Sequence, residues 1–169
     1  MAKTLLLTCA AGLVAVALVA EGMPRPAPEA AESPVEAAAP TPPVPIGNFA
    51  GRVTLDRTAD SHFYADAQVN GAQVRFLVDT GATSVVLTAA DAQRAGIGGG
   101  DYNATGLGAG GTVRLKPVTL DRVAVGTLSA SNVPAMVAEG DTLPVSLLGQ
   151  SWLAALGTVT IEGDRMVLE

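Results

Sequence analysis

The chain has 169 residues, of which 49% are hydrophobic and 15% are charged, and its formal net charge is −6. This length suits one modest domain with extensions rather than two full domains. From residue 47 onward the chain has 12 acidic and 8 basic residues without a basic cluster, which argues against nucleic acid as a partner. The same part contains no cysteine, so its fold must be held by its core or by a partner subunit.

The N-terminus predicts a targeting segment followed by a spacer. Lys3 precedes an uninterrupted apolar stretch at residues 5–20, which is typical of a signal peptide or of an uncleaved membrane anchor. We therefore assign residues 1–22 to one of these two and expect an exported protein, soluble or tethered through residues 5–20. Residues 23–46 are rich in Pro, Ala and Glu and contain no aromatic residue, which predicts a disordered spacer.

Short strands and glycine-containing turns dominate the remaining chain, residues 47–169. His62–Val69 and Gln73–Asp79 read as two strands on either side of Asn70-Gly71, a strong hairpin signal because both residues tolerate positive φ. Residues 88–96 predict a short helix with Thr88 as its N-cap and Gly96 as its end.

The C-terminal part predicts further short elements. Residues 105–115 form a glycine-rich segment, and residues 118–138 read as a meander with turns near Asp121-Arg122 and near Gly126. A strand end at residues 147–149 leads into a second short helix at residues 151–156. A last hairpin turns at residues 162–164. The sequence predicts a mostly β domain with one or two brief helices.

The stretch FLVDTGATSVVL, residues 76–87, places the carboxylate of Asp79 at the end of a hairpin strand between apolar runs. An acid there is costly to ionise unless another group shares or solvates its charge. Gly81 lets another backbone approach closely, and Thr80 can hydrogen-bond around the carboxylate. The stretch therefore predicts one half of a pair of carboxylates.

Three segments, in this order, resemble the retropepsin-like aspartic proteases, specifically the small bacterial, periplasm-facing branch. FLVDTGAT resembles the catalytic elbow, TGLGAGGTV lies where a glycine-rich flap is expected, and SLLGQSWL resembles the second signature. The resemblance covers most of residues 60–169. It implies a small closed acid-protease β-barrel over residues 47–169, active as a two-fold dimer and located in the periplasm.

The resemblance also implies a role for each matching residue. It makes Asp79 the catalytic aspartate and assigns the support of the catalytic loop to Thr80, Gly81 and Ala82. The second signature, packed behind that loop, comprises Leu147, Leu148 and Gly149. The flap that closes over substrate comprises Gly106, Leu107, Gly108, Ala109, Gly110 and Gly111. This flap is richer in glycine than those of the relatives.

The chemistry requires two carboxylates about 3 Å apart that share one proton. The chain has one Asp-Thr-Gly, so a second copy must supply the second aspartate, and we expect a homodimer with Asp79 of both copies at the axis. The expected function is an aspartic endopeptidase that cleaves polypeptide substrates without a cofactor. The alternative is a non-catalytic, exported, dimeric interaction module of the same fold.

Other chemistries have weaker support. His62 is the only histidine and precedes a strand, so we expect a surface position rather than a base or a ligand. With no cysteine beyond Cys9, no metal site is expected. The glycine run cannot be a phosphate-binding loop of the usual kind, because no Lys-Ser/Thr follows it. Trp152 is expected to pack in the core.

Overall fold

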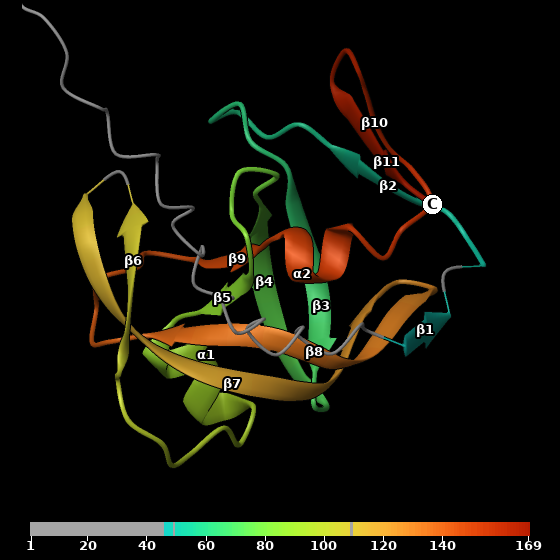
Figure 1. Ribbon diagram of the computed structural model, residues 1–169. Helices are drawn as coiled ribbons and strands as arrows, with labels where there is room; N and C mark the ends of the chain where they lie inside the picture. The colour runs from blue at the N-terminus through green and yellow to red at the C-terminus, as the bar shows by residue number, and fades with distance from the viewer. Residues whose placement is uncertain (1–45, 49, 109) are drawn as a thin grey trace, which may run out of the picture. The chain divides into compact units, whose positions relative to one another are not determined.

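A computed structural model describes residues 46–48, 50–108 and 110–169 (Figure 1). In chain order the elements are β1 (Ile46–Asn48), β2 (Val53–Asp56), β3 (Tyr64–Val69), β4 (Ala72–Val78), β5 (Val85–Leu87), α1 (Ala89–Arg94), β6 (Ala104–Gly108), β7 (Gly111–Val125), β8 (Leu128–Ala138), β9 (Ser146–Leu148), α2 (Gln150–Leu153), β10 (Val159–Glu162) and β11 (Arg165–Leu168).

Six of these strands close into a barrel. They follow the order β8, β5, β9, β4, β3 and β7, and β7 pairs with β8 to complete the ring. Two pairings are parallel, β4 with β9 and β5 with β8, and the other four are antiparallel. β1 adds to β8, and β6 adds to β7. The prediction of a small, mostly β, closed barrel with one or two short helices is confirmed.

Local sequence signals place two of these elements. Asn70 and Gly71, which join β3 to β4, have φ values of 49° and 90°, as a tight two-residue turn requires. α1 follows Thr88, whose Oγ1 accepts a hydrogen bond from the backbone N–H of Asp91 at 3.1 Å. Gly96 follows the helix with φ 71°, the left-handed conformation that commonly ends a helix. The predicted hairpin and helix are confirmed.

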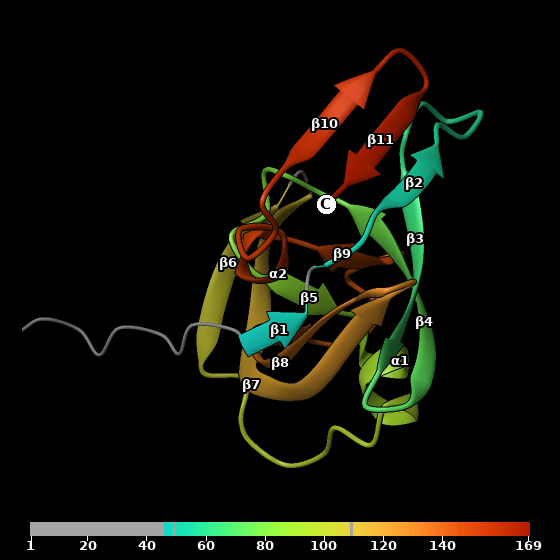
Figure 2. The same ribbon diagram turned by 90° about the vertical axis from the view of Figure 1, so that its right-hand side faces the viewer.

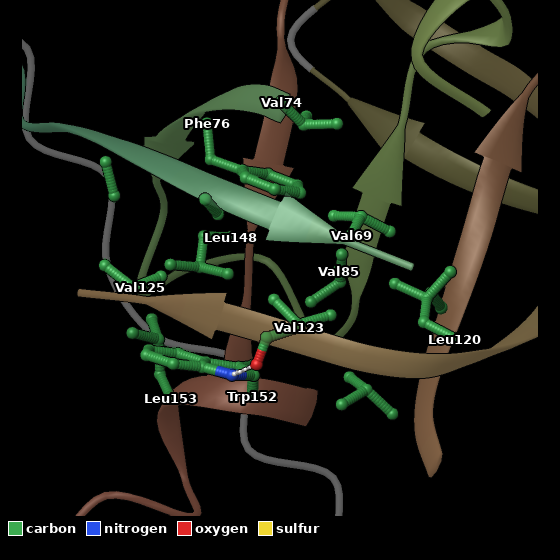
Figure 3. Close-up of a cluster of buried hydrophobic side chains, with 14 of the residues drawn as sticks. Val69, Val74, Phe76, Val85, Leu120, Val123, Val125, Leu148, Trp152 and Leu153 are labelled. Atoms are coloured by element: carbon green, nitrogen blue, oxygen red, sulfur yellow. Dashed lines mark hydrogen bonds between the residues drawn. The ribbon is translucent and has the colours of Figure 1, made fainter. Parts of the chain in front are cut away.

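The hydrophobic core is mostly aliphatic and includes two buried phenylalanines, Phe63 and Phe76; Figure 3 shows part of it. Phe76 of β4 is fully buried, and burying such a side chain contributes roughly 1.5–3 kcal/mol to the free energy of unfolding. Trp152 of α2 is also fully buried, as predicted, and its Nε1 donates to the carbonyl of Val123 at 3.4 Å. This contact fixes α2 against the C-terminal end of β7.

The predicted turn near Asp121-Arg122 is wrong, because β7 continues through both residues to Val125. Register with β8 is kept on both sides, with Leu120 opposite Val133 and Arg122 opposite Ser131. The two polar residues are exposed positions of a long strand. The backbone of Arg122 is held from the β3–β4 turn, since its N–H donates to Oδ1 of Asn70 at 3.1 Å and its carbonyl accepts from the N–H of Asn70 at 3.0 Å. The predicted turn near Gly126 is confirmed, with φ 54°.

A separate three-stranded sheet, in the order β10, β11, β2, lies beyond one end of the barrel (Figure 2). The predicted hairpin at residues 162–164 forms β10 and β11, with Gly163 at φ 56°. β2 pairs with β11 although more than 100 residues separate Val53 from its partner Leu168. Local sequence patterns carry no signal for this pairing.

The predictions for residues 1–22 and for the spacer up to residue 45 lie outside the described residues, as does Ala109 of the predicted flap. Across residues 46–48, 50–108 and 110–169, the two short helices are not of the length and apolar character needed to span a membrane.

Candidate active site

Asp79 lies directly after β4, at the start of a tight turn. Its backbone N–H donates to the carbonyl of Leu148 at 3.1 Å, and its carbonyl accepts from the N–H of Ala82 at 3.2 Å. Its side chain is part of the turn as well, because Oδ1 accepts a hydrogen bond from the N–H of Gly81 at 2.9 Å. The carboxylate is therefore oriented by the backbone of its own loop.

The second predicted signature lies against this turn. β9 runs between β4, to which it is parallel, and β5, to which it is antiparallel, with Leu147 opposite Leu77 and Leu148 opposite Val78. Beyond β9, the N–H of Gln150 donates to the carbonyl of Ala82 at 2.8 Å. Segments separated by about 70 residues in sequence are thus hydrogen-bonded to each other at the turn.

Two contacts explain the residue types at this junction. A Cβ on Gly149 would lie 2.2 Å from the carbonyl oxygen of Ser84 and 2.7 Å from that of Ala82, so only glycine fits. The side chain of Gln150 donates from Nε2 to the carbonyl of Thr80 at 2.8 Å. Gly149 was predicted from the sequence and Gln150 was not, because Gln150 lies in the second-signature stretch but has no role in the pattern itself.

A buried polar network holds β9 from the other side. Ser146 is fully buried, and its Oγ donates to Oδ2 of Asp91 at 2.5 Å while it accepts from the N–H of Thr88 at 3.0 Å. Oδ1 of Asp91 pairs with Arg94 on the surface of α1. Buried polar groups that are fully hydrogen-bonded favour one arrangement of the core. This network fixes β9 to the start of α1, and no sequence pattern predicted it.

The carboxylate of Asp79 is half-buried at the mouth of the turn. Within the part of the chain that the structure describes, no Lys, Arg or His forms an ion pair with it. Thr80 and Gly81, which follow it, are exposed. The turn therefore presents an acid and its adjoining backbone at the surface of the domain, where a second group can approach.

β6 and β7 form the predicted flap hairpin, with Gly108 opposite Gly111 at its tip. Leu107 beside the tip is 88% exposed. The base of the hairpin is anchored through Arg114, whose Nη1 lies 3.0 Å and 3.2 Å from the two carboxylate oxygens of Glu139. Its Nη2 donates to the carbonyl of Tyr102 at 2.9 Å. The base of the hairpin is therefore bound to the rest of the domain through Arg114, and the residue beside its tip is exposed.

Two concavities of about 330 and 470 Å³ open on the outer face of β3 and β4, and both are lined in part by Asp66 and Gln73. Asp79 lines neither of them. Among the described residues, no group of three or more His, Cys, Asp or Glu side chains is placed to hold a metal ion.

Fold and turn together define the class: this is a retropepsin-like aspartic protease fold. The model of the gag-polyprotein putative aspartyl protease family matches residues 65–155, and the chain belongs to that family. A crystal structure of a retropepsin-like aspartic protease from Rickettsia conorii has a TM-score of 0.63 and 38% sequence identity to this chain. That match covers 70% of this chain and 98% of the other.

Two curated proteins are also similar. An uncharacterized protein of Rickettsia prowazekii is 37% identical over 120 residues, which is 70% of this chain and 51% of the relative. An uncharacterized protein encoded in the cobV 5′ region of Sinorhizobium sp is 34% identical over 118 residues, which is 69% of this chain and 51% of the relative. The chain thus spans about half the length of these curated relatives.

Proposed function

We propose that this domain is an aspartic endopeptidase that hydrolyses peptide bonds of polypeptide substrates. The observation that carries the proposal is the turn at Asp79. Its carboxylate is oriented by the N–H of Gly81, and its backbone is fixed to Leu148, in a chain that belongs to an aspartyl protease family. A fixed, half-buried acid at the mouth of a turn suits a group that must exchange protons with a substrate.

We infer that a second copy of the chain completes the site. In the chemistry of paired carboxylates, the two acids share one proton; one activates a water molecule while the other protonates the peptide carbonyl. One chain supplies one Asp79 in an Asp-Thr-Gly turn. Two copies related by a two-fold axis would bring both turns together, with the exposed Thr80 and Gly81 next to the axis.

The flap completes the proposed site. Its residues Gly106 to Gly111, with Leu107 exposed beside the tip, would cover a polypeptide that lies across the two aspartates. Closure would exclude water other than the attacking molecule and hold the peptide in register. Ala82, Leu147 and Gly149 support the turn from behind.

We also propose that the protein is exported to the periplasm. Residues 1–22 would be its signal peptide or membrane anchor, and residues 23–46 its spacer. The support is the sequence pattern of one lysine followed by an apolar stretch and a proline-rich segment.

The test is cleavage of an unstructured protein, with and without a pepstatin-type inhibitor, over a range of enzyme concentrations. We expect inhibitor-sensitive cleavage whose specific activity falls on dilution, because dissociation separates the two aspartates. Dilution-independent activity together with a monomeric mass under assay conditions would contradict the dimeric site. Binding of the unstructured protein without any cleavage at any concentration would contradict the endopeptidase.

A further inference from the structure

One edge of the three-stranded sheet is open. β10 is the outermost strand in the order β10, β11, β2, and among the described residues no strand lies on its other side. An open strand edge presents unpaired N–H and C=O groups, to which a strand of another chain can bond. The proposed chemistry makes no use of this edge.

The hydrogen bonds between β10 and β11 show which backbone groups face outward. Thr158 and Glu169 bond to each other in both directions, N–H to carbonyl, at 2.7 and 3.0 Å. Along an antiparallel strand, successive residues direct their backbone groups alternately to one side and to the other. The groups of Thr160 therefore point to β11, and those of Val159 and Ile161 point away from it. The open edge thus carries the N–H and the C=O of two residues.

The side chains of these two residues are apolar. Ile161 is 52% exposed and, with Leu107 of the flap, is one of two large hydrophobic side chains exposed among the described residues. Val159 lies on the same face of β10 and packs against the core. Figure 2 shows the β10–β11 hairpin projecting beyond the barrel, so the end of β10 lacks the cover that its start has.

A second copy of β10 matches this pattern. If two copies pair antiparallel about a two-fold axis at Thr160, Val159 lies opposite the partner's Ile161, and each of the two equivalent pairs exchanges two hydrogen bonds. All the outward groups of both residues are then bonded. Apolar side chains face each other, and Thr160 meets the partner's Thr160, a favourable cross-strand pair. A register moved by two residues in either direction pairs only one of these two residues within the strand.

The charges favour β10 over the other edge of the sheet. β2 contains Asp56 and lies between Arg52 and Arg57, and charged side chains on an edge strand discourage pairing with another chain. β10 contains one charged residue, Glu162 at its end. In the register about Thr160 this acid lies opposite the partner's Thr158, so no like charges meet.

The open edge is connected to the candidate active site through α2. Gln150, the first residue of α2, donates from its backbone N–H to the carbonyl of Ala82 and from its side chain to that of Thr80. β10 begins only a few residues after α2 ends. Figure 1 shows the loop between β4 and β5 and the small sheet at the same end of the domain. A partner bound to β10 would therefore lie at the end that carries Asp79.

We propose that two copies of the chain associate through β10, so that the two small sheets join into one across a two-fold axis at Thr160. This inference rests on the proposed endopeptidase function, whose site is incomplete without a second Asp79. The C-terminal strand β11 already has β10 on one side and β2 on the other and offers no edge to a partner. Because the paired strands are short, the contact is small, and we expect association to be reversible.

The first test removes an outward N–H. In Ile161→Pro the lost N–H is not bonded to β11, so the β10–β11 pairing should remain. Each copy loses one donor, and the dissociation constant of the dimer, measured by sedimentation of the full chain, should rise by at least about tenfold. Ile161→Asp keeps every backbone group, places a charge opposite the partner's Val159 and should weaken association as well.

Thr54→Pro is the matched control at the other edge. The N–H of Arg57 donates to the carbonyl of Asp164 on β11 at 2.8 Å, and the same alternation directs the N–H of Thr54 away from β11. This variant should therefore leave the dissociation constant unchanged. Weaker association in Thr54→Pro with none in the two Ile161 variants would move the interface to β2 and overturn the proposal.

A disulfide tests the register. Cys9, the only cysteine of the chain, is first replaced by serine. Thr160→Cys then places two thiols at the axis, where opposite residues outside the hydrogen-bonded pairs have Cα atoms about 4.5 Å apart, within the reach of a disulfide. Glu162→Cys is the control on the same face of β10, because its two copies would lie four residues apart along the strands, roughly 13 Å. Oxidation should link the first variant and not the second.

Cleavage of an unstructured protein separates this inference from the proposed function. The Thr160→Cys dimer should keep its specific activity on dilution when oxidised and lose it when reduced. Failure of this disulfide to form, or a linked dimer that is inactive while the unlinked protein cleaves, would overturn the interface and leave the endopeptidase intact. A disulfide at Thr160→Cys and weakened association in Ile161→Pro, without cleavage by any form, would count against the endopeptidase and support the interface.

Discussion

The turn at Asp79 and the flap hairpin are held in opposite ways. The turn is bonded to a distant segment through Leu148 and Gln150, and it packs so tightly on Gly149 that a single methyl group does not fit. The flap pairs only with itself beyond its base, and a Cβ on Gly110 would meet no atom within 4 Å. The chain thus fixes the turn that carries the proposed catalytic acid and leaves free the hairpin that is proposed to admit substrate.

The largest expected effect comes from removing the acid without disturbing its turn. In Asp79→Asn the amide oxygen can still accept from the N–H of Gly81, so the fold should be retained. We expect cleavage of an unstructured protein to fall by roughly 10²–10⁴-fold, the usual contribution of a general acid or base. Initial rates of cleavage measure the activity, and urea unfolding measures the stability of the fold. A folded variant with ordinary activity would show that Asp79 is not catalytic.

Next in size is a break in the packing behind the turn. Gly149→Ala places a methyl group 2.2 Å from a backbone oxygen, which cannot move without shifting the loop after Asp79. We expect a loss of at least about 2 kcal/mol in the free energy of unfolding, as for other overpacked sites. Gly98→Ala is the matched control, because its Cβ would meet no atom within 4 Å. Equal stability of the two variants would disprove the close packing.

The flap should show the reverse behaviour. Gly110→Val adds a branched side chain where there is space, so urea unfolding should change little, while reduced backbone freedom at the tip should lower turnover severalfold. Gly111 is a poorer choice, because its φ of 107° would strain any substituted residue. A change in turnover could then not be separated from a change in stability. An unchanged kcat in the folded Gly110→Val protein would argue against a moving flap.

The smallest expected effect concerns Asp60, in the loop between β2 and β3, whose carboxylate accepts hydrogen bonds from Oγ1 of Thr58 and from the hydroxyl of Tyr64. Since the pKa of Asp60 is lowered from 3.8 on folding, its contribution to stability is complete above about pH 4–5 and is lost as the pH falls through the folded value. Asp60→Asn should therefore lower the urea midpoint at pH 7 slightly, and the difference from the unaltered protein should shrink below pH 4. Asp141→Asn, an exposed acid outside this loop, is the control. If the difference in urea midpoint between Asp60→Asn and the unaltered protein grew toward low pH, a lowered pKa of Asp60 in the folded state would be contradicted.

The difference between contacts with near and with distant residues also explains which features the sequence could predict. Features set by neighbouring residues were predictable: the Asn70-Gly71 turn, the cap at Thr88 and the Asp-Thr-Gly turn each depend on local backbone preferences. Features set by distant partners were not. The pairing of β2 with β11 has no local signal. The bond from Ser146 to Asp91 links two residues whose types are common in many other settings.

The misread turn at Asp121-Arg122 has the same origin. Two adjacent polar residues are typical of a turn, yet here the β3–β4 turn supplies Asn70 to satisfy the backbone of Arg122, and the strand continues. His62 is instructive in a different way. Its exposed position was predictable from the sequence, but the 3.4 Å approach of its Nδ1 to Oδ2 of Asp60 depends on the conformation of the loop, in which Ser61 has φ 68°.

The position of β9 sets the order in which the domain can become complete during synthesis. β4 and β5 are close in sequence, but the strand that separates them, Ser146–Leu148, is made about 60 residues later. Contacts of such long sequence separation slow folding, because a large loop must close before they form. A nascent chain that ends before Leu148 lacks the carbonyl that binds the N–H of Asp79. A half-made chain therefore has the acid without the bond that fixes it, and the candidate site can mature only once almost the whole domain has been translated.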